Sequence, residues 1–260
     1  MKKALLLTGL LLVLVAPLAT ADGVNLAWGT ECWGLLDSPS NLVTFACLSN
    51  TVPASWKMTT SFMVDADIPD YNSFNAVIRG VSEAGAIPDW WELSAAATDC
   101  RYAAVSNVSF NPAYAGVSDL CGYPFAGTAM GGGAYGYIQP QVIQINGLYA
   151  VAGDGAFLAG GTETFGYTVS IKNTKTVGTG SCTGCLFGMV FGLNYVVITK
   201  VSDGDIDMID TVIPGGNQCL IWQRGFNMAA AGDYAAAVQP CNAPVPARNT
   251  TWGQVKSLYR

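Results

Sequence analysis

The sequence predicts an all-β protein: an antiparallel β-sandwich, Ig-like or jelly-roll-like, with Gly-rich loops and disulfides. Three observations predict it. Short apolar runs separated by Gly, Pro, Asn, Asp and Ser follow one another along the chain, no alternation of strand and helix patterns is present, and eight cysteines offer cross-links. The clearest run places Phe165, Tyr167, Val169 and Ile171 at every second position, which is the period of a strand with one buried face.

The expected strands are bounded by turn-forming residues. They are Val24–Trp28, Leu42–Cys47, Thr59–Asp65, Phe74–Arg79, Tyr137–Ile145, Thr164–Lys172, Leu186–Lys200, Ile206–Val212 and Gln218–Gln223. The stretch 186–199 is apolar almost throughout, so a buried helix is the alternative there. Alanines favour short helices over Asp89–Ala97 and Asn227–Val238. Gly127–Gly136 is expected to be a flexible, low-complexity loop.

The first 21 residues have the three parts of a secretory signal peptide. Lys2 and Lys3 are followed by an uncharged run from Ala4 to Ala16 and by the small residues of Ala19-Thr-Ala. The run is shorter than the roughly 20 residues that span a bilayer, and no later segment is predicted to span one. We therefore expect a signal peptide over 1–21, a single sandwich domain over 22–241, and a C-terminal tail over 242–260. The protein is expected to be secreted, extracellular or at the cell surface, with the periplasm as an alternative.

The mature chain is acidic and poor in charge. Without Lys2 and Lys3, ten basic side chains face 18 acidic ones, so the net charge is about −8. Charged residues make up 12% of the chain, against about 25% in an ordinary soluble domain. Because no cluster of Lys and Arg offers a phosphate-binding surface, nucleic acid and anionic lipid are not expected partners.

An even number of cysteines behind a signal peptide predicts disulfides. The pairing is formally open, and proximity along the chain favours neighbours: Cys32–Cys47, Cys100–Cys121, Cys182–Cys185 and Cys219–Cys241. The three loops of about 15 to 22 residues would each stabilise the fold by roughly 3 kcal/mol. The Cys-Thr-Gly-Cys stretch is also compatible with a redox pair. A structural staple is favoured, because a Gly-rich turn precedes the first cysteine where a catalytic pair needs a helix N-terminus.

The absence of histidine excludes Ser-His-Asp and Cys-His catalysis and all His-ligated metal sites. No catalytic residue is therefore assigned. Gly131-Gly-Gly-Ala-Tyr-Gly136 matches the dinucleotide-binding string, but that motif needs a preceding strand and a following helix, and neither is predicted.

Acidic residues offer two further sites. Asp203, Asp205 and Asp207 alternate, so they would share one face of a strand and could bind Ca²⁺, although solvated acidic turns are the default interpretation. Otherwise no cofactor is expected. Paired carboxylates, for instance among Glu83, Glu92 and Glu163, could form a glycosidase site, although no sequence pattern brings two of them together.

Seven tryptophans are more than a sandwich core commonly uses. Trp90 and Trp91 would point to opposite faces of an extended segment, so one ring could be exposed as a sugar-binding platform. The alternative is that both rings pack beneath a loop.

The C-terminal peptide has an unusual composition. The stretch 248–260 carries three basic residues and no acid, and Trp252, Val255 and Tyr259 would form one apolar stripe if helical. Its ending Thr-Trp-Gly-x-x-Lys-x-Leu-Tyr-Arg resembles the C-terminal ends of a group of uncharacterised secreted proteins of environmental bacteria. Asn25-Leu-Ala-Trp28 and the stretch 172–185 resemble the same group. The resemblance implies a secreted β-protein and no particular activity, and the tail is interpreted as a sorting or docking peptide.

These features favour a non-catalytic extracellular protein, either a binding module or a structural subunit of a surface or matrix. Polysaccharide, other cell-surface components and further copies of the chain are the expected partners. A secreted carboxylate-dependent hydrolase acting on polysaccharide is the competing hypothesis, and a thiol-redox protein is the third.

Overall fold

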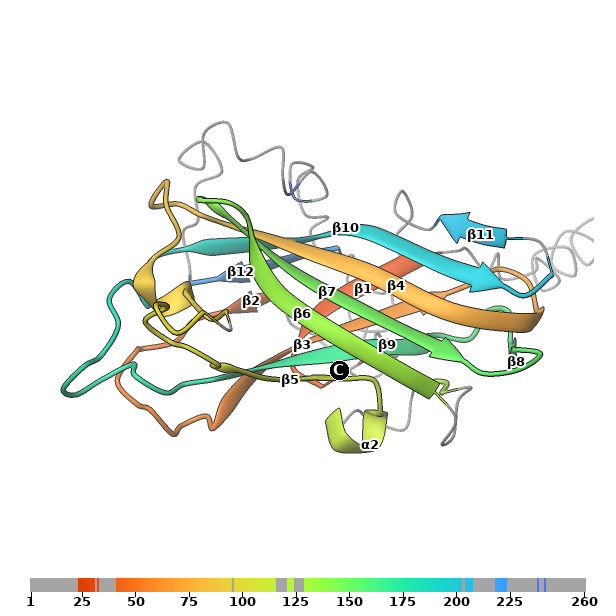
Figure 1. Cartoon of the computed structure of the whole chain (residues 1–260), viewed down its shortest axis with the longest axis horizontal. Coiled ribbons are helices and arrows are strands. Elements are labelled where there is room, and N and C mark those ends of the chain that lie inside the picture. Colours follow the sequence, from red (N-terminus) through yellow and green to blue (C-terminus); the bar gives the residue numbers. More distant parts are fainter. Residues whose placement is uncertain are drawn as a thin grey trace, which may run out of the picture.

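The computed structural model describes residues 23–30, 32, 41–94, 96–115, 121–123, 129–202, 204–207, 218–223, 238 and 241. Over these ranges the chain is nearly all β, and its strands build two sheets that pack face to face (Figure 1). The predicted all-β sandwich class is thereby confirmed. The signal peptide expected over 1–21, the tail 242–260 and nearly all of the helix expected over Asn227–Val238 lie outside the described residues.

The smaller sheet has four antiparallel strands in the order β1-β3-β9-β5. They are β1 Gly23–Trp28, β3 Ser55–Met63, β9 Thr164–Lys172 and β5 Val105–Ser109. Strand β9 has the predicted bounds, and Tyr167, Val169 and Ile171 enter the main core as their period predicts. Phe165 instead packs with Cys32 in a separate cluster. The pairing of β3 with β9 shifts register between Thr59 and Ser61, which breaks the alternation at this end of β9.

The larger sheet has eight described strands. Six lie in the order β2-β12-β10-β4-β7-β6, while β8 pairs with β4 and β11 pairs with β10. Their bounds are β2 Leu42–Val43, β12 Cys219–Trp222, β10 Met189–Lys200, β4 Ile68–Ser82, β7 Val142–Val151, β6 Ala129–Gln139, β8 Ala156–Leu158 and β11 Gly204–Asp207. All described pairs are antiparallel except β2 with β12. The stretch 186–199, for which a helix was the alternative, is therefore mainly strand β10.

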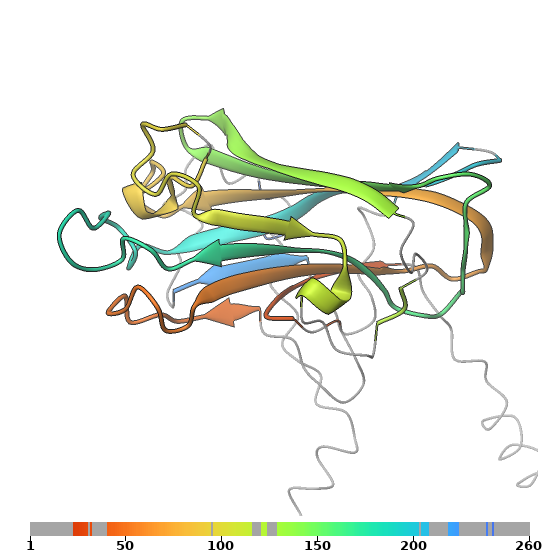
Figure 2. The ribbon, with the colours of Figure 1, turned by 60° about the horizontal axis from the view of Figure 1, so that its bottom comes forward.

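The two sheets also approach each other at their edges. Strand β5 contacts β6 on one side, and β1 contacts β12 on the other, where the indole N–H of Trp28 donates to the carbonyl of Ile221 at 3.0 Å. The two layers and their near edges can be followed in Figure 2. The only described helices are short: a 3₁₀ turn η1 at Asp89–Trp91, where a longer helix was expected, and α2 at Pro112–Ala115.

Glycines in the larger sheet make room for side chains of the smaller one. Gly133 and Gly147 are directly paired across β6 and β7. A Cβ at Gly147 would lie 2.4 Å from the ring of Tyr167, and one at Gly133 would lie 2.5 Å from Val108. These glycines are therefore required by close packing between the sheets rather than by a turn.

This packing corrects two predictions. Gly127–Gly136 is not a loop where it is described, because Ala129–Gln139 forms the eleven-residue strand β6. The single strand expected over Tyr137–Ile145 is instead interrupted by a hairpin turn at Pro140 and Gln141, which joins β6 to β7. Three described strands had no counterpart in the prediction: β5, β8 and most of β7.

Candidate functional site

The disulfides differ from the predicted neighbour pairing. The bonds are Cys32–Cys121, Cys47–Cys185, Cys100–Cys182 and Cys219–Cys241, with Cα–Cα distances of 5.3 to 6.0 Å. Only the last was predicted correctly. The other three join residues 82 to 138 positions apart, because the sandwich brings distant loops to the same end or edge.

The Cys-Thr-Gly-Cys stretch is consequently not a dithiol pair. Cys182 bonds to Cys100 and Cys185 bonds to Cys47, so each cysteine fastens the stretch to a different segment. Both residues are about 5% exposed. The stretch is thus held by two disulfides to two different segments. The hypothesis of a redox-active pair loses its structural basis, because the two sulfurs are not bonded to each other.

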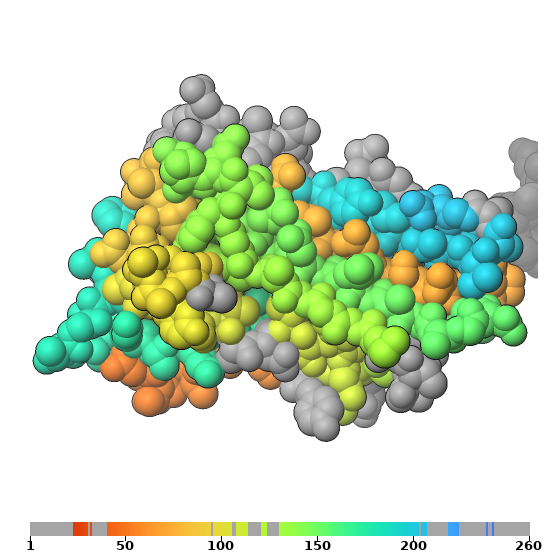
Figure 3. All heavy atoms as spheres, viewed as in Figure 1, coloured from red at the N-terminus to blue at the C-terminus, as the bar shows by residue number. Residues whose placement is uncertain are grey.

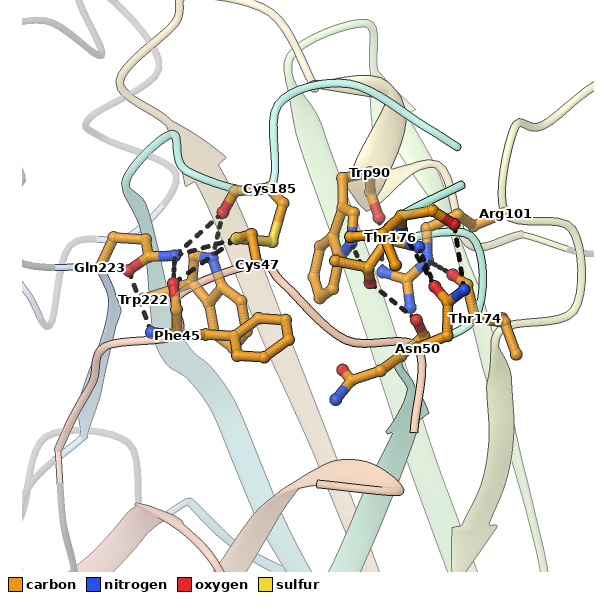
Figure 4. The surroundings of a disulfide bond; sticks show 12 residues. Phe45, Cys47, Asn50, Trp90, Arg101, Thr174, Thr176, Cys185, Trp222 and Gln223 are labelled. Carbon is orange, nitrogen blue, oxygen red and sulfur yellow. Dashed lines mark hydrogen bonds between the residues drawn. A yellow bond between two sulfur atoms is a disulfide. The ribbon is translucent and has the colours of Figure 1, made fainter. Parts of the chain in front are cut away.

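These two disulfides hold together three loop segments, 44–54, 83–104 and 173–188, which gather at one end of the sandwich (Figure 1). We call this region the loop end. Figure 4 shows its first half around the bond from Cys47 to Cys185. The side-chain amide of Gln223 accepts from the backbone N–H of Phe45 at 3.1 Å and donates to the carbonyl of the same residue at 2.8 Å. The carbonyl of Cys185 accepts from Gln223 at 3.1 Å and from the indole of Trp222 at 2.9 Å.

The second half of the loop end is organised by the buried cation Arg101, shown at the right of Figure 4. Its guanidinium donates to the carbonyls of Trp90 at 2.7 Å and Thr174 at 2.9 Å, and also to that of Lys172. The Cζ atom lies 3.7 Å from the centre of the Trp90 ring, within the range of a cation–π interaction. Burial lowers the pKa of Arg101 to about 9, so the group is charged at neutral pH.

A chain of polar contacts continues from Trp90. Its indole N–H donates to the hydroxyl of Thr176 at 2.9 Å, and that hydroxyl donates to the carbonyl of Asn173 at 2.7 Å. The carboxamide of Asn50 accepts from the backbone N–H groups of Thr176 and Val177 at 2.7 and 3.0 Å. These side chains add to the backbone hydrogen bonds of the loops, so the loop end is ordered by polar side chains, backbone hydrogen bonds and disulfides together.

Trp90 and Trp91 are both 0% exposed, which contradicts the exposed sugar-binding platform. They belong to an aromatic cluster centred on Trp222. Trp90 stacks on Trp222 at 5.0 Å, and Trp91 meets it edge-on at 5.3 Å. The pair lies in a 3₁₀ turn and packs beneath the loop end, which is the alternative that the sequence left open.

Among the described residues, none accepts a hydrogen bond from the buried indole N–H groups of Trp56 and Trp91 in this cluster. Both rings meet Trp222 nearly at right angles, Trp56 at 88° and Trp91 at 89°. The cluster therefore belongs to the core of the sandwich.

The three glutamates considered for a glycosidase site each have a partner within the fold. Glu83 accepts from the backbone N–H of Gly188 at 2.6 Å, and Glu92 accepts from that of Cys100 at 3.1 Å. Glu163 accepts from the hydroxyl of Ser61. These bonds fix loops and strand ends.

The acidic stretch considered for calcium is described only in part. Asp203 and the side chain of Asp207 lie outside the described residues. Asp205 is exposed on β11, and its carboxylate accepts from the hydroxyl of Thr199 at 3.0 Å. Among the described residues, no group of three or more Cys, Asp or Glu side chains is placed to hold a metal ion.

Two further acidic residues, Asp67 and Asp70, bind backbone N–H groups of other loops. Asp67 accepts from the N–H of Gly160 at 2.8 Å, and Asp70 accepts from that of Ser202 at 2.7 Å. Hydrogen bonds from the side chain and the backbone of Ser202 lower the pKa of Asp70 below its usual value. Both carboxylates therefore fix loops that flank β4.

Strand β6, which the sequence assigned mostly to a loop, is the longest described strand at a sheet edge. Among the described strands it pairs only with β7, and it is exposed over much of its length, with Met130 at 77% and Ile138 at 45% exposure. The space-filling view shows β6 open on the viewed face of the molecule (Figure 3). The signal that could have revealed a strand is the alternation around Tyr135 and Tyr137, whose hydroxyls reach Trp91 and Asp99 on the inner side.

Comparison with known proteins gives no match: no family model, no curated protein and no solved structure resembles the chain at a significant level. Within the part of the chain that the structure describes, no helix is long and apolar enough to cross a membrane.

Proposed function

We propose that the mature chain is an exported, non-catalytic β-sandwich that serves as a structural subunit of a cell surface or extracellular matrix. The proposal rests on one observation: the side chains that were candidates for catalysis, redox chemistry or sugar binding all make structural contacts within the fold. All eight cysteines form disulfides, Trp90 and Trp91 are buried, and Glu83, Glu92 and Glu163 have partners in the fold.

Export is supported by two independent features. The sequence begins with the pattern of a signal peptide, and disulfides persist in oxidising compartments outside the cytoplasm. Three of the four bonds close long loops, which suits a protein that must keep its shape without chaperones or ATP.

A structural role is favoured over a carbohydrate-binding role by what the surface offers. The aromatic pair proposed for sugar stacking lies in the core, so the described surface gains no platform from it. The described surface does offer β6, a long sheet edge with no charged side chain. Exposed edges of this kind are sites of strand pairing between chains.

The test uses the purified mature protein in three assays: hydrolysis of a panel of polysaccharides, retention on insoluble polysaccharide, and sedimentation velocity over a range of concentrations. Heat-denatured, reduced protein is the control for non-specific retention. The proposal predicts no hydrolysis, no retention above the control, and concentration-dependent association.

Hydrolysis that is lost on a single Glu→Gln or Asp→Asn substitution would overturn the non-catalytic proposal in favour of the hydrolase. Saturable retention by a protein that stays monomeric would replace the structural role with a binding role. Recovery of the native protein from the cytoplasm, with residues 1–21 intact by mass, would contradict export.

A further inference from the structure

One edge of strand β6 is not paired with any described strand. Its eleven residues hydrogen-bond to β7 on one side, and among the described strands none pairs with the other side. The inner positions are occupied by contacts across the sandwich, since Tyr135 donates to the carbonyl of Trp91 and Tyr137 to the carboxylate of Asp99. The free edge therefore carries backbone donors and acceptors that are available to another strand.

The other described edge strands are protected in ways that β6 is not. β1 is buried at all six positions, β5 has only five residues, and β2 has two. β11 has four residues and carries Asp205 and Asp207. Short length, burial and charge are the usual means by which proteins prevent pairing between sheets. In β6, residues 129 to 139 include no charge and no proline, and the one irregularity is a register shift near its end.

We propose that β6 pairs antiparallel with β6 of a second copy of this chain, which joins the two larger sheets into one continuous sheet. The inference rests on the proposed structural role and names the contact through which assembly occurs. A two-fold axis at Ala134 aligns the whole strand with its counterpart. On the outer face this register places Met130 opposite Ile138 of the other copy, Gly132 opposite Gly136, and Ala134 opposite itself.

This register gives each of two exposed apolar side chains a contact partner in the other copy. Met130 and Ile138 lie near opposite ends of β6 and are 77% and 45% exposed. In the antiparallel pair they form two equivalent contacts, one at each end of the shared ladder, and each contact removes apolar surface from water. A strand without net charge meets an identical strand without repulsion, and the symmetric arrangement is the commonest one among homodimers.

The experiment exploits the position that faces itself. Ala134→Lys places two like charges opposite each other across the axis, and Ala134→Glu does the same with the opposite sign. Each variant alone is expected to weaken self-association of the full mature chain by about tenfold or more. An equimolar mixture of the two is expected to recover association as heterodimers. Asn75→Lys, on the outer side of the interior strand β4, is the matched control and is expected to associate like the wild type.

Sedimentation velocity and mass photometry measure the association, and far-UV circular dichroism checks that each variant is folded. A monomeric wild type would overturn the inference. So would association that persists equally in both Ala134 variants, and that result would leave the proposed structural role standing through another surface. If Asn75→Lys also abolishes self-association, the edge of β6 does not determine it and the inference fails. Hydrolytic activity of the wild type would instead count against the proposed function itself.

Discussion

Replacing Gly147 with alanine tests how the two sheets fit together. The added Cβ would lie 2.4, 2.5 and 2.7 Å from three ring carbons of Tyr167. The ring cannot retreat easily, because it is 0% exposed, its hydroxyl donates to the carbonyl of Ala76 at 3.3 Å, and it packs edge-on against Phe74 at 6.1 Å. Overpacking of this kind costs about 1–3 kcal/mol. At about 2–4 °C per kcal/mol for a domain of this size, we expect Tm to fall by about 2–12 °C.

Gly132→Ala is the matched control, because a Cβ at Gly132 meets no atom within 4 Å. Alanine is about 0.5–1 kcal/mol better than glycine inside a strand, so this variant should be unchanged or slightly more stable. Guanidinium and thermal unfolding, followed by circular dichroism at one protein concentration with disulfides intact, measure both variants. A second substitution, Tyr167→Leu, should relieve the clash and give a coupling energy of at least about 1 kcal/mol with Gly147→Ala. Equal stability of the two alanine variants would refute the close packing inferred between the sheets.

Three further outcomes are expected. Arg101→Lys should lower the free energy of unfolding by about 3 kcal/mol in denaturant titrations, because an ammonium cannot donate to three carbonyls and also stack on an aromatic ring. A loss below about 1 kcal/mol would show that the guanidinium is dispensable. Replacing Cys47 and Cys185 together with alanine should cost about 2–5 kcal/mol by the same measurement, and an unchanged midpoint would contradict a structural role for the bond. Burial raises the pKa values of Tyr71 and Tyr149, so above about pH 10 the unfolded state releases protons that the folded state keeps, and stability falls as pH rises. Absorbance titration should show these phenols ionising only with unfolding, whereas smooth ionisation near pH 10 in the folded protein would contradict their burial.

The sequence predicted elements whose pattern is local. Strands β1 and β9 were found within a residue of their bounds, because alternation or an apolar run between turn residues is a property of the segment itself. Strand β6 was missed because its glycines were interpreted as turn residues. One of them, Gly133, is instead needed to make room for Val108 on the opposite sheet, and this contact between two separate strands leaves no local mark in the sequence. Pro140 did carry a usable signal, since a proline inside an apparent strand indicates a break.

The candidate sites were less predictable than the fold. A signal-peptide pattern and an even cysteine count indicated disulfides, but proximity along the chain predicted three of the four pairings wrongly, because loops distant in sequence meet at the ends of a sandwich. The hypothesis that one ring of Trp90 and Trp91 is exposed assumed an extended segment, whereas the two residues lie in a 3₁₀ turn and both rings are buried. The buried cation Arg101 was not identified, because its three acceptors are backbone carbonyls that have no sequence signature.

The disulfides connect separate segments of the chain, and Cys182 and Cys185 are not bonded to each other. Tryptic mapping of the non-reduced native protein can establish this connectivity. The bonds predict two cross-linked species. One joins the four peptides that end at Lys57, Arg101, Lys172 and Lys200, and the other joins the two that end at Arg224 and Arg248. A peptide 176–200 that migrates alone, two hydrogens lighter than its reduced form, would place the bond between Cys182 and Cys185 and contradict the account.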